Sequence, residues 1–228
     1  MAGRLVLYTG DKNASSWSMR GFVALVEKEV PFEERTILFR EDKSRSRRYE
    51  ISPTGKVPVL HHFTGDSPAG APRVIPDSLA IVEYLEETFP PPAHPALWPV
   101  DPAARADARW LAAAMHSGWP RLRESMSFNL CFLHGPKAPT PEALAEAAEI
   151  LGIWERALTS GRPGGPFLAG LFSAADILFA PVVIRLTAFR VPLARTPHAA
   201  AYMAAVRERP SVERWMKEAR SLPPQETY

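Results

Sequence analysis

Within residues 1–88 the spacing of apolar residues alternates between strand-like and helix-like patterns. Short apolar runs bounded by polar or turn residues predict strands at residues 5–8, 32–39, 57–60 and 73–75. Apolar side chains spaced at helical intervals predict an amphipathic helix that begins at Trp17 and stops at Pro31, and another that opens at Asp77. Residues 61–72 hold glycines and prolines and are typical of a long hairpin loop. This order predicts a small α/β layer with a mixed sheet.

After a proline-rich stretch the pattern becomes helical. Residues 89–101 are interpreted as a linker, because consecutive prolines cannot continue a helix and favour a stiff connection. Asp101 followed by Pro102 is typical of a helix start, and residues 105–132 are predicted to form one long helix with a bend near Gly118. Apolar stripes predict further helices at residues 144–158, 174–186 and 212–219. The second of these is apolar on nearly every side, which indicates a fully buried helix.

Composition and charge narrow the classes of function. The 228 residues are 46% hydrophobic and 23% charged, an ordinary globular balance. The net charge of +2 comes without a long basic stripe, so no nucleic-acid partner is expected. The basic run at residues 43–48 fits either a solvated helix face or a site for an anionic ligand group. A single cysteine, Cys131, and the absence of a long apolar run predict a cytoplasmic protein without a disulfide or a membrane partner.

The first candidate for chemistry lies between the first strand and the first helix. Ser15 and Ser16 stand where free backbone N–H groups and the helix dipole favour an anion. A serine hydroxyl there could donate a hydrogen bond to a bound thiolate. Serine is also a preferred N-cap residue, and on spacing alone capping is the favoured interpretation.

Two further candidates precede the third strand and the second helix. If the bond between Val57 and Pro58 were cis, the backbone of Val57 would point away from the sheet and could pair with an extended peptide. A trans proline at a strand start is the ordinary alternative. Asp77 and Ser78 at a helix start could hold a carboxylate and an amino group, or could act only as caps.

The joint order of these features resembles the cytosolic glutathione transferase family over essentially the whole chain. The resemblance rests on Ser15/Ser16, Val57-Pro58, Asp77-Ser78, the proline-rich linker and a capping box at Ser173 and Asp176. The N-terminal half is most similar to the bacterial serine-type, zeta-like branch. The resemblance implies a thioredoxin-like glutathione-binding domain at residues 1–88, a linker at 89–101, and an all-helical domain at 102–228 that contributes the electrophile site.

The resemblance also implies roles for single residues. Either Ser15 or Ser16 would be catalytic, Pro58 would follow a cis bond, and the backbone of Val57 would pair with the cysteinyl part of glutathione. Asp77 and Ser78 would hold the γ-glutamyl end of glutathione, and Lys56 and Lys43 would lie near its glycine carboxylate. Met115 and Trp119 would line the electrophile pocket, with Phe128 a further lining candidate. A place in the hydrophobic core explains Met115, Trp119 and Phe128 at least as well.

Glutathione would be the cosubstrate, a small hydrophobic electrophile or a peroxide the partner substrate, and a homodimer the expected assembly. No metal or other cofactor is implied, and the activity would be conjugation, peroxide reduction or isomerisation in detoxification. Two departures stand out: zeta-class members usually carry a cysteine in the loop that here contains Ser15 and Ser16, and Asp77 stands where glutamate is more common.

Two other functions are compatible with parts of this pattern. A thiol–disulfide oxidoreductase on this fold needs a cysteine at the start of the first helix, and Cys131 lies far from that position in sequence. A non-catalytic binding protein would have no need for Ser15, Pro58 and Asp77-Ser78 together, although a fold does not fix a function.

Overall fold

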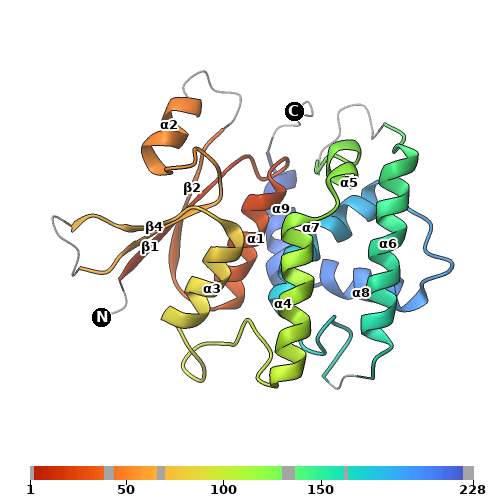
Figure 1. Cartoon of the computed structure of the whole chain (residues 1–228). Coiled ribbons are helices and arrows are strands. Elements are labelled where there is room, and N and C mark those ends of the chain that lie inside the picture. The colour runs from red at the N-terminus through yellow and green to blue at the C-terminus, as the bar shows by residue number, and fades with distance from the viewer. Residues whose placement is uncertain (1–2, 39–43, 66–69, 130–136, 162–163, 223–228) are drawn as a thin grey trace.

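The structure is a computed structural model that describes residues 3–38, 44–65, 70–129, 137–161 and 164–222. Its elements are, in chain order, β1 (Arg4–Thr9), α1 (Ser16–Glu27), β2 (Phe32–Thr36), α2 (Ser44–Ile51), β3 (Val59–Phe63), β4 (Arg73–Ile75), α3 (Ser78–Thr88), α4 (Pro102–Ser117), α5 (Pro120–Ser125), α6 (Pro141–Leu158), α7 (Ala174–Ala188), α8 (Pro197–Arg207) and α9 (Pro210–Arg220). A sheet-containing half and a helical half lie side by side (Figure 1).

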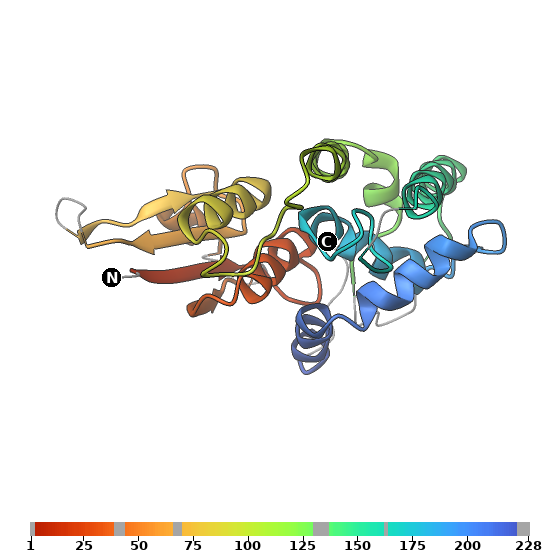
Figure 2. The ribbon, with the colours of Figure 1, turned by 90° about the horizontal axis from the view of Figure 1, so that it is seen from below.

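The four strands form one sheet in the order β2-β1-β3-β4. Strand β1 runs parallel to β2 and antiparallel to β3, and β4 is antiparallel to β3. The prediction of a mixed sheet is therefore confirmed, and with it the thioredoxin-like fold class of this half. Helices α1 and α3 contact each other and the sheet, and α1 also contacts α7 and α9, so it lies between the sheet and the helical half (Figure 1 and Figure 2).

Helix α7 is the centre of the helical half. Residues 174–186 are all buried, which confirms the prediction from their apolar sequence. The helix contacts α1, α4 and α8, and its Phe179 meets Trp154 of α6 edge to face at 5.3 Å. The predicted capping box is present, since the Asp176 carboxylate accepts hydrogen bonds from the Ser173 N–H (2.8 Å) and hydroxyl (3.0 Å).

The prediction of one long helix over residues 105–132 was wrong. Helix α4 ends at Ser117, and a separate helix α5 begins at Pro120. Between them Gly118 is extended and Trp119 has the left-handed φ of 53°. Proline removes a helical N–H and so cannot continue the α4 hydrogen-bond ladder. The last part of that predicted helix lies outside the described residues.

The strand boundaries also differ from the predictions. Strand β2 ends at Thr36, earlier than expected, and Phe39 lies outside the described residues. Strand β3 extends through Phe63, into the segment predicted as a hairpin loop. Its His61 and His62 are buried, and they pair with β1 and β4 instead of forming a turn.

The C-terminal part was expected to be helical throughout, but no separate apolar stripe was predicted for helix α8. Its sequence is rich in alanine, and only four of its side chains are buried. A stripe of small residues gives a weak apolar period, so the pattern does not distinguish this helix from a loop.

The segment 89–101 contains no helix or strand and is anchored to both halves. The Leu97 N–H donates to the Glu86 carboxylate of α3 at 2.9 Å, and its carbonyl accepts from the Ala174 N–H of α7 at 2.7 Å. In the part of the chain that the structure describes, no helix is long and apolar enough to cross a membrane. Within the same ranges no group of His, Cys, Asp and Glu side chains is arranged to hold a metal ion.

Candidate active site

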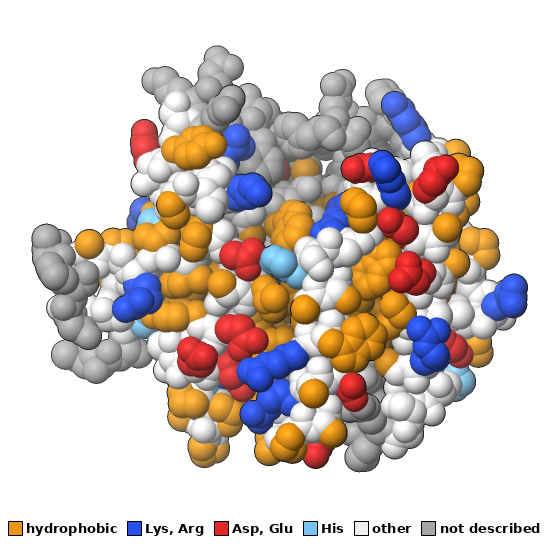
Figure 3. All heavy atoms as spheres, in the orientation of Figure 1, with side chains coloured by type: hydrophobic (Ala, Val, Ile, Leu, Met, Phe, Trp, Pro, Cys, Tyr) orange, Lys and Arg blue, Asp and Glu red, His pale blue; other side chains and the backbone are white. Residues whose placement is uncertain are grey.

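A cavity of about 560 Å³ lies where four separate segments meet. These are the β1–α1 loop, the stretch from α2 to β3, the start of α3 and the end of α4. Its lining residues are Ala14, Ser15, Ser16, Trp17, Arg48, Gly55, Lys56, Val57, Pro58, Pro76, Asp77, Ser78 and His116. On the face of the molecule seen in Figure 3, acidic and basic side chains are interspersed among apolar ones.

The two serines at the start of α1 have different hydrogen-bond partners. Ser15 is the N-cap: its Oγ accepts from the Ser18 N–H at 3.3 Å and donates to the Ser18 Oγ at 2.8 Å. Ser16 Oγ instead accepts from the Arg185 guanidinium of α7 at 3.3 Å. The proton of Ser15 is therefore used inside the first turn of its own helix, whereas the oxygen of Ser16 is held by the helical half.

The Val57–Pro58 peptide bond is cis, as the family resemblance implied. Val57 lies two residues before β3 and takes no part in the sheet pairing, which starts at Val59. Pro58 packs on Gly21 of α1, where an added Cβ would lie 3.2 Å from the Pro58 Cβ, so a larger residue there would push the proline loop away. The turn before it needs glycine, because Gly55 has φ 62°.

Asp77 and Ser78 lie at the start of α3. Asp77 is the N-cap, and its Oδ1 accepts from the N–H groups of Leu79 (2.8 Å) and Ala80 (3.0 Å). Its Oδ2 lies 3.3 Å from His116 Nε2. Ser78 is 1% exposed and lines the cavity, yet its hydroxyl has no hydrogen-bond partner among the described residues. A buried hydroxyl left without a partner costs about 1–3 kcal/mol, which a bound polar ligand would recover.

Of the other predicted site residues, only one lies at the cavity within the described part of the chain. Lys56 lines the cavity, and Lys43 lies outside the described residues. Met115 and Trp119 are buried in the hydrophobic core and are not among the residues that line the cavity. Phe128 is also in that core.

Sequence reasoning missed three large side chains of the cavity. Trp17 and His116 meet edge to face with ring centroids 5.3 Å apart, so α1 and α4 form one wall together. Arg48 comes from the basic run, where an anion site was one of two readings. Its position in α2 is set by the fold, and no spacing in the sequence singles it out from its basic neighbours.

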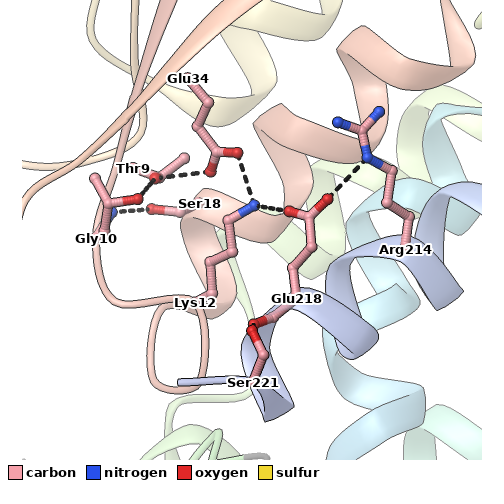
Figure 4. Close-up of polar contacts among 9 residues, drawn as sticks. Thr9, Gly10, Lys12, Ser18, Glu34, Arg214, Glu218 and Ser221 are labelled. Atoms are coloured by element: carbon pink, nitrogen blue, oxygen red, sulfur yellow. Dashed lines mark hydrogen bonds and ion pairs between the residues drawn. The ribbon is translucent and has the colours of Figure 1, made fainter. Parts of the chain in front are cut away.

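A buried lysine anchors the loop that carries the two serines. Lys12 Nζ donates to Glu34 of β2 at 2.7 Å and to Glu218 of α9 (Figure 4). The side chain of Lys12 is only 8% exposed, and its Nζ lies 4.2 Å from the centroid of the Phe22 ring and 4.9 Å from that of Trp215. The loop that carries Ser15 and Ser16 is thus fixed to β2 and to α9 at one point.

The fold and the cavity together define a class. The thioredoxin-like sheet carries a cis-proline loop and is joined through its first helix to an all-helical half, and the starts of α1 and α3 help to form the cavity. This is the arrangement of a glutathione transferase.

Comparisons with known proteins agree. The model of the glutathione S-transferase N-terminal domain matches residues 14–88, and that of the C-terminal domain matches residues 137–218. A probable maleylacetoacetate isomerase of Caenorhabditis elegans is 30% identical over 193 residues, covering 84% of this chain and 83% of the relative. The maleylacetoacetate isomerase of Rattus norvegicus is 32% identical over 202 residues, covering 86% and 84%.

Among solved structures, a glutathione transferase homolog from Burkholderia GL BGR1 with bound glutathione has a TM-score of 0.70 and 29% identity, covering 96% of this chain and 99% of that one. The chain belongs to the glutathione S-transferase family. The family resemblance and the glutathione transferase fold drawn from the sequence are confirmed.

Proposed function

We propose that the cavity binds glutathione and activates its thiol for reaction with a small electrophilic substrate. The observation that supports this most directly is the grouping of Ser15, Ser16, Val57 and Ser78 around one cavity, although these residues come from three distant segments. Family membership and a similar structure with bound glutathione support the same ligand.

The proposed binding mode assigns each part of glutathione to a feature of the cavity. The γ-glutamyl carboxylate takes the unpartnered hydroxyl of Ser78 at the start of α3, and the amino group faces Asp77. The cysteinyl backbone pairs with Val57, as an added strand would. The glycine carboxylate lies towards Lys56 and Arg48, the cationic residues of the lining.

The thiol then lies at the start of α1, where the chemistry requires a thiolate. A free thiol has a pKa of about 8.5, and lowering it by about two units requires about 2.7 kcal/mol of preferential stabilisation of the anion. A helix N-terminus contributes up to about 1–2 kcal/mol and a hydrogen bond to a charged group about 1.5–3 kcal/mol. The hydrogen bond from one serine hydroxyl and the α1 N-terminus together can supply this stabilisation of the thiolate.

Glutathione-assisted isomerisation is a second candidate reaction for the same thiolate, because the two curated relatives described above carry the name maleylacetoacetate isomerase. Conjugation and peroxide reduction use the same thiolate. Parallel assays with a chloronitrobenzene, an organic hydroperoxide and a cis-enedione acid distinguish the three.

We further propose a cytoplasmic homodimer with a role in detoxification, as the family resemblance implies. The same resemblance supports a division of labour between residues 1–88, which bind glutathione, and residues 102–228, which contribute the electrophile site. Sedimentation at the monomer mass would contradict the dimer.

Calorimetric titration with glutathione tests the binding proposal. Wild-type protein is expected to bind, and Ser78→Ala to bind about tenfold more weakly, since one hydrogen bond to a charged group is lost. Ser160→Ala is the matched control, because that exposed hydroxyl donates to the Ala157 carbonyl of α6, away from the cavity. Absence of binding by the wild type at millimolar glutathione would refute the proposal.

A further inference from the structure

Three arginines from three helices gather behind the cavity. Arg20 of α1 and Arg185 of α7 are 1% and 5% exposed, and Arg123 of α5 is partly buried. The guanidinium carbons of Arg20 and Arg123 lie 4.2 Å and 5.5 Å from the centroid of the Trp17 ring, which lines the cavity. The cluster therefore contacts the wall of the proposed glutathione site from inside the protein.

None of the three forms an ion pair with a carboxylate in the described part of the chain. Their hydrogen bonds to the backbone go to neutral groups: Arg20 Nε to the Leu178 carbonyl (3.1 Å), Arg185 Nε to the Met126 carbonyl (2.8 Å), and Arg123 to the carbonyls of His116 and Gly118. One terminal nitrogen each of Arg20 and Arg185 has no partner among those residues.

Buried charge without a counterion is unfavourable, and the titration of these groups reflects it. Burial, and then the positive charge of Arg123, lowers the pKa of Arg185 to about 9. Burial, Arg185 and Arg123 together lower the pKa of Arg20, and the carboxylate of Asp77 opposes them only in part. Burial also lowers the pKa of Arg123, against the charge of Glu146.

Arg185 nevertheless keeps its charge, because a pKa of about 9 leaves it protonated at neutral pH. A nearby anion would relieve the unfavourable charge of the cluster. The cavity that Trp17 separates from the cluster is where the proposed function places a thiolate.

The cluster reaches the cavity through one hydroxyl. Arg185 Nη2 donates to Ser16 Oγ at 3.3 Å, and Ser16 lines the cavity. A guanidinium can only donate, so the oxygen of Ser16 is the acceptor and its own proton stays available. The proton of Ser15 already goes to Ser18. Of the two serines, Ser16 is therefore the one with a proton to offer a ligand.

We propose that Arg185 is a positioning residue that fixes Ser16 as the hydrogen-bond donor to the glutathione sulfur, and that the thiolate is the missing counterion of the arginine cluster. The inference rests on the proposed function. The S–H bond breaks, its proton leaves to solvent, and the electron pair stays on sulfur, which accepts the Ser16 hydrogen bond. The helical half thus acts on the thiol as well as on the second substrate.

The test is the thiol pKa of bound glutathione, followed by thiolate absorbance between pH 5 and 9. Arg185→Met is expected to raise that pKa by about one to two units, the usual effect of losing a nearby opposite charge. Arg185→Lys should restore about half of the shift. Glutathione affinity at low pH, where the thiol is protonated in every variant, should change by less than about threefold.

Serine variants separate positioning from charge. Ser16→Ala should raise the thiol pKa, while Ser15→Ala should leave it within about 0.3 units of wild type. In the Ser16→Ala background, Arg185→Met should add less than half of its single-variant effect, because most of the influence of Arg185 on the sulfur is expected to pass through the Ser16 hydrogen bond.

Two outcomes would overturn the inference: an unchanged thiol pKa in folded Arg185→Met, or full additivity with Ser16→Ala. Should Arg185→Met fail to fold, Arg185→Lys carries the test, and a thiol pKa equal to that of wild type in this variant would overturn the inference equally. Failure of wild-type protein to bind glutathione would instead refute the proposed function, so the two failures are distinguishable.

Discussion

Replacing Lys12 with methionine removes the charge that joins the loop between β1 and α1 to β2 and α9. The pair with Glu34 is the main loss, because those side chains are 8% and 18% exposed. Breaking a fully buried pair costs about 3–5 kcal/mol, and Glu34 keeps a hydrogen bond from the Thr9 hydroxyl at 3.0 Å, so we expect about 2–3 kcal/mol here.

The other interactions of Lys12 add less. Glu218 is 38% exposed and also accepts from Arg214 at 2.9 Å, so its loss contributes no more than about 0.5 kcal/mol. Methionine keeps the apolar contact with Phe22 and Trp215 but loses a cation–π interaction of about 0.5–1 kcal/mol. The variant should therefore be less stable by about 3 kcal/mol, a fall in melting temperature of about 6–12 °C for a chain of this size.

Urea unfolding followed by tryptophan fluorescence measures this difference. Arg214→Met is the matched control, since it removes an exposed partner of Glu218 and should change the free energy of unfolding by less than about 0.5 kcal/mol. Turnover with glutathione should also fall in the lysine variant, because the loop that holds Ser15 and Ser16 loses its anchor. A Lys12→Met protein as stable as the Arg214→Met control would refute the reasoning.

Two more predictions concern stability. Burial raises the pKa of Asp176 to about 6, against the hydrogen bonds from Leu168 and Ser173. The protonated carboxyl therefore stabilises the fold fully below pH about 4, and this stabilisation is lost as pH rises to about 6. In urea titrations the free energy of unfolding of wild type relative to Asp176→Asn should fall across that window, and a flat difference would contradict this. Met115→Ala should lower the free energy of unfolding by about 2–5 kcal/mol, because Met115 lies in the hydrophobic core. Glutathione affinity measured by calorimetry should stay unchanged, since Met115 does not line the cavity. A change in affinity with little loss of stability would instead place Met115 in the binding site.

Elements with strong periodicity were predictable from the sequence. Helices α7 and α9 bury the apolar positions that the spacing indicated, and α1 buries all of them except Val26, which is partly buried. The break between α4 and α5 was not predicted as such, because a proline within an apolar pattern is compatible with either a bend or a new helix, and the left-handed backbone of Trp119 decides it. His61 and His62 looked like loop residues, yet the strand accommodates them through hydrogen bonds to the Ile51 carbonyl and the Tyr84 hydroxyl.

In the candidate site, too, some residues could be predicted from the sequence and others could not. The resemblance named Ser15, Val57 and Ser78, and the structure brings them to one cavity. It did not name His116 or Arg185, because each reaches the site from a helix far along the chain. Such contacts depend on how α4 and α7 pack against α1, and no local pattern in the sequence records that packing.

The contact between Lys12 and Glu218 joins positions 206 residues apart along the chain. During synthesis the sheet, the proline loop and both serines leave the ribosome long before α9 is made. A nascent chain at that stage holds nearly every group of the cavity, but the lysine that steadies the serine loop has only one of its two carboxylates. The second anchor of the loop that carries Ser15 and Ser16 is therefore added only when α9 is translated.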